Sequence, residues 1–133
     1  IGVIHLVCQQ APSALDCFGQ AEPIFRQLYD HEHLSQLYLN QGIAYRMCGQ
    51  VQHSVRLLQA AIELFEPIGN LEWLANAVDE LGVTLLHMGD TKRAITTFQE
   101  ALTILAATPD LSTYRRREIT EHLHTALQSL AQS

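Results

Sequence analysis

Histidine is the residue type in this sequence best suited to bind a metal ion or to move a proton near neutral pH. Seven histidines are present, and the closest pairs are His31/His33 and His122/His124. Residues two apart on a helix point to opposite sides, whereas joint ligation needs a spacing of three or four. The first pair stands where a loop enters a predicted helix, which weakens that objection, but neither pair has a third ligand that can be named. We therefore expect solvated histidines and no metal site.

Serine chemistry gives no catalytic candidate either. Ser13, Ser35 and Ser54 have no recognisable base with an orienting acid. The sequence contains neither G-x-S-x-G nor H-E-x-x-H, and neither of the phosphate-binding patterns G-x-x-x-x-G-K-[ST] and G-x-G-x-x-G. The sequence predicts a protein that is not an enzyme and that requires no cofactor.

The three cysteines, Cys8, Cys17 and Cys48, form no C-x-x-C pattern, and any disulfide would leave one of them unpaired. A reduced, cytoplasmic protein with buried apolar thiols is the expected context. The chain begins with Ile1, and its first eight residues lack the features of a signal peptide, so we expect a piece of a longer protein.

Basic side chains gather only at Arg115-Arg116-Arg117. The simpler interpretation is a solvated helix face whose charge is offset by Glu118 and Glu121. The functional alternative is a contact with an acidic partner segment or with a domain outside this sequence.

Composition excludes two classes of partner. The net charge of −6 argues against binding to nucleic acid phosphates. Polar residues interrupt every apolar stretch before it reaches the roughly 20 residues that a membrane-spanning helix needs. With 133 residues, of which 47% are hydrophobic and 17% charged, the chain is expected to fold as one domain around a core.

The elements that must position these residues repeat along the chain. Gly2, Gly42 and Gly82 are 40 residues apart, and the same step joins Gln9, Gly49 and Gly89. Small residues recur where helices approach closely, large apolar ones where a gap is filled, and Gly, Asn or Asp where the chain turns. Further sets at this spacing are Ala14/Ser54/Ala94, Leu15/Val55/Ile95, Phe18/Leu58/Phe98, Ala21/Ala61/Ala101 and Asp30/Asn70/Asp110.

Apolar residues at steps of three and four predict helices and no strand. Pro67, Gly69, Pro109 and Asp110 are expected to end helices, while Asp90 and either Asn70 or Leu71 are expected to cap the helices that follow them. The predicted helices are 1–8, 12–29, 33–48, 52–66, 72–88, 91–106 and 112–131.

The third unit carries Val78, Leu81-Gly82, Leu85, Ala94 and Phe98, and the second carries Tyr38, Gln41-Gly42, Tyr45, Ser54 and Leu58. This spacing resembles the tetratricopeptide repeat (TPR) family, in the long-repeat form found in kinesin light chains and in bacterial regulators. The resemblance implies an all-α, right-handed α-solenoid of stacked antiparallel helix pairs. It implies one domain over 1–133, with an incomplete first repeat (1–30), a second (31–70), a third (71–110) and a C-terminal helix (111–133) that caps the array or begins a further repeat. The first unit departs most from the pattern, because Pro23 interrupts its second helix.

The resemblance also implies a concave face, lined by the first helix of each pair, that holds a partner peptide or domain. Carried over position by position, the lining residues are Gln36, Leu39, Asn40, Ile43 and Arg46, then Asn76, Asp79, Glu80, Val83 and Leu86, then Arg116, Ile119, Thr120 and Leu123.

We therefore predict a non-enzymatic interaction module with a protein or peptide partner. The alternative is an effector-sensing helical domain of a bacterial transcription regulator or signalling ATPase. A third hypothesis is a homo-oligomer formed through the N-terminal helix, where Ile1, Val3, Ile4, Leu6 and Val7 are too apolar to face water comfortably.

Overall fold

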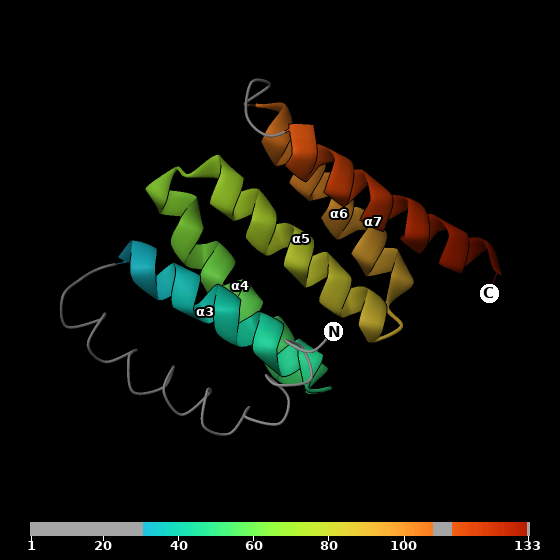
Figure 1. Cartoon of the computed structure of the whole chain (residues 1–133), viewed down its shortest axis with the longest axis horizontal. Coiled ribbons are helices and arrows are strands. Elements are labelled where there is room, and N and C mark those ends of the chain that lie inside the picture. The colour runs from blue at the N-terminus through green and yellow to red at the C-terminus, as the bar shows by residue number, and fades with distance from the viewer. Residues whose placement is uncertain (1–30, 108–112, 133) are drawn as a thin grey trace. The chain divides into compact units, whose positions relative to one another are not determined.

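The computed structural model describes residues 31–107 and 113–132, and within them it contains five α-helices and no strand (Figure 1). The helices are α3 (His31–Met47), α4 (Val51–Ile68), α5 (Leu71–His87), α6 (Thr91–Ala106) and α7 (Thr113–Gln132). The five corresponding predictions are confirmed to within two residues at each end. The predicted helices 1–8 and 12–29 lie outside the described residues, together with the expected roles of Gly2 and Pro23.

Two compact units divide the chain, residues 1–68 and residues 69–133. In the first, α3 and α4 form an antiparallel pair (Figure 1). In the second, α5 and α6 form such a pair, while α7 packs mainly on α6 and also contacts α5. The predicted single domain with four segments stays a prediction. None of the described helices combines the length and the apolar character needed to cross a membrane.

The repeated glycines lie where the two helices of a pair come closest. A Cβ atom added to Gly42 would lie 2.7 Å from Cγ of Leu58, and one added to Gly82 would lie 2.5 Å from Cε1 of Phe98. Both distances are shorter than non-bonded carbon atoms tolerate. Each pair therefore needs glycine at this point, which confirms that the 40-residue spacing has a structural cause.

The turns inside the two pairs are also equivalent. Gly49 and Gly89 have φ angles of 84° and 85°, in the left-handed region that favours glycine. The N–H of Gly49 donates to the carbonyl of Arg46, and the N–H of Gly89 donates to that of Leu86, both at 3.0 Å. Glycine ends the first helix of each pair in the same way.

Residues 40 apart also share burial in the core of each pair. These sets are fully or almost fully buried in both pairs: Ser54 and Ala94, Leu58 and Phe98, Ala61 and Ala101, Phe65 and Leu105. The sequence repeat therefore marks the packing surface between the two helices of each pair.

The C-terminal end of α4 and the N-terminal start of α6 each differ from what the sequence predicts. Pro67 does not end α4, which continues to Ile68 and stops at Gly69, where φ is 80°. A proline in the last turn removes only one hydrogen bond close to where the helix stops anyway, so glycine sets the end. Asp90 precedes α6 but makes no side-chain capping bond, and its carboxylate pairs with Arg93 at 3.4 Å instead.

Of the two cap positions expected before α5, Asn70 is the cap and Leu71 is the first helical residue. The side-chain oxygen of Asn70 accepts a hydrogen bond from the backbone N–H of Trp73 at 3.2 Å. This bond satisfies one of the amide groups that the first turn of α5 leaves without a helical partner.

Candidate functional site

The residues predicted to line a groove differ in how much of their side chains a partner can reach. On α3, Asn40 is exposed and Leu39 is buried, while the other three predicted residues, Gln36, Ile43 and Arg46, are half-buried. On α5, Asp79 is buried, and Asn76, Glu80, Val83 and Leu86 are half-buried. The buried members contribute to packing and hydrogen bonding rather than to an exposed surface.

The α7 helix is turned differently from the expectation. Arg116 faces α6, where its guanidinium donates to the carbonyl of Leu105 at 3.2 Å, and Ile119 is completely buried. The side chains that reach α5 are those of Arg115 and His122. Neighbouring residues on a helix differ in direction by about 100°, so the stripe that α7 presents to α5 is about one position away from the expected one.

An arginine joins the N-terminal halves of α5 and α7. The Arg115 guanidinium donates to the side-chain oxygen of Asn76 at 2.8 Å and lies 3.8 Å from the Glu118 carboxylate on its own helix. The expectation that Arg115-Arg116-Arg117 is simply solvated is therefore wrong for Arg115 and for Arg116, and only Arg117 is exposed. Both bonded arginines instead hold α7 against its neighbours, because charged donors make strong hydrogen bonds.

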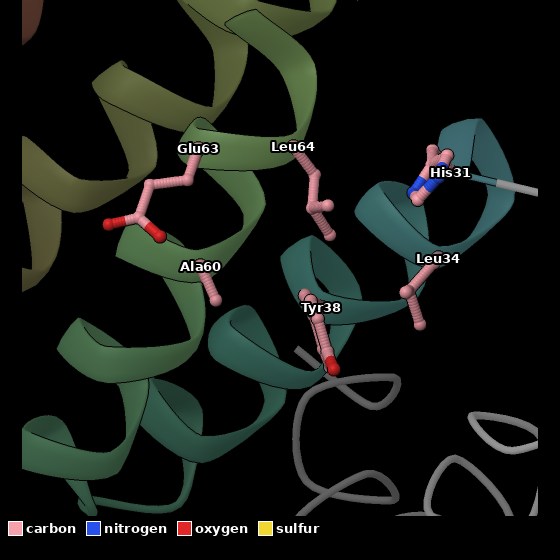
Figure 2. A pocket seen from close by; sticks show the side chains of 6 residues that line it. All are labelled: His31, Leu34, Tyr38, Ala60, Glu63 and Leu64. Atoms are coloured by element: carbon pink, nitrogen blue, oxygen red, sulfur yellow. The ribbon is translucent and has the colours of Figure 1, made fainter. Parts of the chain in front are cut away.

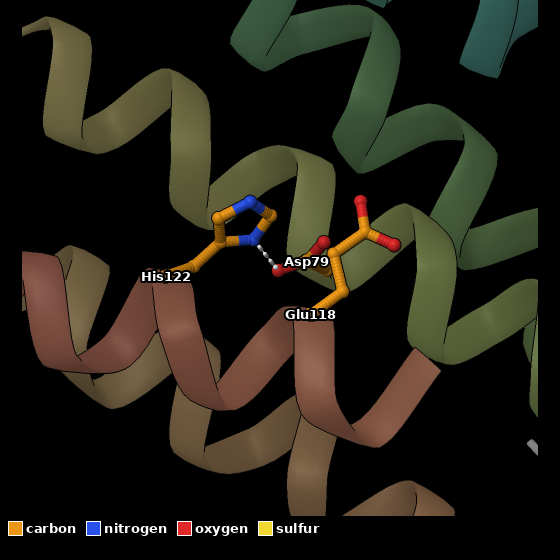
Figure 3. Close-up of side chains that lie close together, drawn as sticks. All are labelled: Asp79, Glu118 and His122. Atoms are coloured by element: carbon orange, nitrogen blue, oxygen red, sulfur yellow. Dashed lines mark hydrogen bonds and ion pairs between the residues drawn. The ribbon is translucent and has the colours of Figure 1, made fainter. Parts of the chain in front are cut away.

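A histidine–aspartate pair also joins the two helices, about one turn further along α5 and two turns further along α7 (Figure 3). Nδ1 of His122 lies 2.9 Å from Oδ1 of Asp79, and the Asp79 side chain is only 1% exposed. The hydrogen bond to Asp79 raises the pKa of His122 above 6.5, against the lowering effect of burial, and the charges of Asp79, Glu118 and Glu80 raise it further. The prediction that His122 is a solvated residue is wrong.

Two more features belong to the surroundings of the His122–Asp79 pair. The ring of Phe98 on α6 lies 5.6 Å from that of His122, centroid to centroid, and so covers one side of the imidazole. The other carboxylate oxygen of Asp79, Oδ2, is buried and accepts no hydrogen bond. Buried carboxylate oxygens are normally satisfied, so this atom needs an explanation.

The sequence contained a signal for this cluster, but the comparison of closely spaced histidines did not detect it. Glu118 and His122 are four residues apart, and this spacing puts them on one side of a helix. The third member, Asp79, was predicted to lie on the first-helix face but was not connected with either of them. We call the surface formed by Asn76, Asp79, Glu80, Val83 and Leu86 of α5 with Arg115, Glu118 and His122 of α7 the α5–α7 face.

The first unit has a hollow of about 370 Å³ that the sequence analysis did not anticipate (Figure 2). It is lined from α3 and α4 by His31, Leu34, Tyr38, Ala60, Glu63 and Leu64. Figure 2 shows the Glu63 side chain directed away from the other labelled side chains. The polar lining groups are the His31 imidazole, the Tyr38 hydroxyl and the Glu63 carboxylate, and these three define no class of ligand.

Comparisons with known proteins agree with this geometry. The sequence model of a family described as "Tetratricopeptide repeat" matches residues 34–107, which span both helix pairs. No curated protein matches the sequence. Among solved structures, a Podosopora anserina chain described as a putative kinesin light chain with nearly identical TPR-like repeats is similar, with a TM-score of 0.74 and 21% identity. The match covers 93% of the present chain and 61% of that one, and at this identity it concerns the fold alone.

Proposed function

The chain belongs to the tetratricopeptide repeat family, whose members generally mediate protein–protein interactions, and we propose that its second unit binds a peptide segment or partner domain along the α5–α7 face. Its role is that of a scaffold rather than a catalyst. The observation that carries the proposal is the pair of cross-helix hydrogen bonds, Arg115 to Asn76 and His122 to Asp79.

These bonds fix the spacing and rotation of α5 and α7 before any partner arrives. A surface that is ordered in advance loses less conformational entropy on binding, so more of the contact energy appears as affinity. The face also combines the elements that peptide recognition uses. Val83 and Leu86 offer half-buried apolar contacts, while Asn76 and Glu80 offer polar groups that can set the register of a bound segment.

A peptide display library selected on the immobilised 133-residue chain tests this proposal. Peptides that survive selection are then measured by fluorescence anisotropy against the unmodified chain and two variants, Val83→Asp and Leu86→Asp. We expect each variant to weaken binding by about tenfold or more, since a central apolar contact is commonly worth over 1 kcal/mol.

The matched control is Gln99→Asp on α6, because Gln99 is exposed and lies outside the α5–α7 face. Its affinity should equal that of the unmodified chain. Circular dichroism and thermal unfolding verify that all variants are folded. Peptides that bind the two α5 variants normally but lose affinity for the α6 variant would place the binding surface elsewhere.

A further inference from the structure

We propose that Asp79, Glu118 and His122 bind a divalent transition-metal ion of the Zn²⁺ type. Each side chain offers one ligand atom, and the three atoms all lie within 4.8 Å of one another. Glu118 and His122 come from one side of α7, and Asp79 comes from α5. In the view of Figure 3, the Asp79 carboxylate lies between the imidazole of His122 and the carboxylate of Glu118.

The buried oxygen of Asp79 is an independent reason to expect a ligand here. Asp79 is 1% exposed, its Oδ1 is bonded to His122, and its Oδ2 has no hydrogen-bond partner. A buried carboxylate is costly unless its charge is paired and its oxygens are satisfied. One histidine beside it satisfies only one of the two oxygens. A cation bound at this point would neutralise the carboxylate and occupy the remaining acceptor, and ligation by Nδ1 of His122 would replace the hydrogen bond of that atom to Oδ1.

The donor set selects the class of ion. An imidazole nitrogen and carboxylate oxygens suit Zn²⁺ and the neighbouring transition metals, whereas Ca²⁺ and Mg²⁺ prefer all-oxygen shells of six or more ligands. Two carboxylates balance the charge of a divalent ion when His122 is neutral. The three protein ligands leave at least one coordination position, which water occupies.

Metal binding requires only a small movement of ligand atoms, and the Glu118 side chain can make it. Ligand atoms about 2.0–2.2 Å from a zinc ion lie roughly 3–3.5 Å from one another. The present spacing of up to 4.8 Å must therefore shorten. Glu118 has a side chain that is 36% exposed, and rotation about its bonds brings its carboxylate inward while the helices stay in place. The partial exposure of Glu118 and of His122, at 33%, also gives the ion a path from solvent.

Titration calorimetry with ZnCl₂ on the metal-free 133-residue chain tests the proposal, and the visible absorption of bound Co²⁺ reports the coordination geometry. We expect one tight site per chain and a raised thermal unfolding temperature, because an ion that binds only the folded state stabilises it. His122→Gln and Glu118→Gln should each weaken binding by about 100-fold or more, since even the loss of a group that only supports a ligand costs about 10–100-fold. Asp79→Asn should do the same, and its circular dichroism spectrum verifies that it is folded.

The matched control is the double variant Glu121→Gln/His124→Gln. It removes the same two residue types from the same helix, but both positions are exposed. Its affinity and stoichiometry should equal those of the unmodified chain. Absence of a tight site, equal weakening in the control, or Mg²⁺ and Ca²⁺ binding as tightly as Zn²⁺ would each overturn the proposal. Binding that survives both His122→Gln and Glu118→Gln would overturn it as well and would assign the ion to other surface histidines.

Discussion

The two helix pairs share one scaffold, but one buried position that is apolar in the first pair carries a charged residue in the second. Gly42 and Gly82 both lie against a large side chain of the second helix, and both turns end in a left-handed glycine. In the first pair the buried residue at position 39 is leucine, whereas its equivalent in the second pair is Asp79. The closest approach and the turn of each pair are therefore repeated, while the buried charge of the second pair lies where α5 meets His122 of α7. A repeat protein can vary function at such positions without altering its scaffold.

The largest expected effect comes from truncating the large side chain that packs between the two helices of each pair. Phe98→Ala should lower the free energy of unfolding by about 4 kcal/mol and Leu58→Ala by about 3 kcal/mol, because both side chains are completely buried. The loss is greater at Phe98, whose ring also covers His122. Urea denaturation followed by circular dichroism measures both, with the exposed Gln99→Ala on α6 as the control. A loss at Leu58 as large as that at Phe98 would contradict this order.

Exchanging leucine and aspartate between the equivalent positions 39 and 79 tests whether the surroundings of Asp79 make a buried carboxylate tolerable. Leu39→Asp should destabilise the protein by about 3 kcal/mol, because it buries a carboxylate at a position built for an apolar side chain. Asp79→Leu should change stability by less than about 1 kcal/mol, because it removes a buried carboxylate with an unsatisfied oxygen and leaves only a partly exposed histidine that can become neutral. Thermal and urea unfolding at neutral pH measure the two changes in stability. Similar losses in both exchanges would contradict the view that only the second unit accommodates a carboxylate.

Adding one methyl group to each repeated glycine compares the two close approaches directly. Gly82→Ala should cost about 2 kcal/mol, because the new Cβ meets the Phe98 ring at 2.5 Å. Gly42→Ala should cost about 1 kcal/mol, because the leucine it meets adjusts its rotamer more readily than a ring does. Denaturant unfolding measures both values. Adding Phe98→Leu to the Gly82→Ala variant should recover part of the loss, and if it deepened the loss, the overlap would not be its cause.

The smallest effect is the dependence of stability on pH through His122. Its pKa is raised in the folded state by Asp79, Glu118 and Glu80, so the stabilisation is fully present below pH 6.5 and is lost as pH rises through the folded pKa. In the presence of a chelator, the free energy of unfolding should fall more above pH 6.5 in the unmodified chain than in His122→Gln. The difference should be under about 1 kcal/mol because solvent screens the partly exposed ring. Parallel profiles of unfolding free energy against pH for the two proteins would contradict this prediction.

The scaffold could be predicted because its signals are local or repeated. Helix ends at Gly49 and Gly89 follow from the backbone freedom of glycine, and the five helices follow from apolar residues at steps of three and four. The termination assigned to Pro67 was wrong because proline is tolerated in a last turn when a glycine just beyond it stops the helix. Each of these features depends on residues that are neighbours in sequence.

The α5–α7 face was predicted only in part. Membership of Asn76, Asp79, Glu80 and Val83 in one stripe of α5 follows from helical periodicity. The residues that α7 presents to α5 did not follow, because they depend on how α7 packs on α6 and α5. The partner-binding role of this face, and of Gln36, Asn40, Ile43 and Arg46 on α3, stays a prediction.

The sequence by itself determined that this chain forms helix pairs, where each pair turns and which residues lie between its helices. Glycine conformation, apolar periodicity and a fixed repeat length are properties that can be read from residue order alone. Only the tertiary structure decided that Asp79 meets His122 and Glu118, about 40 residues later in the chain. That meeting depends on how α7 is rotated and seated on its neighbours, and small differences in packing free energy between possible rotations leave no periodic mark in the sequence.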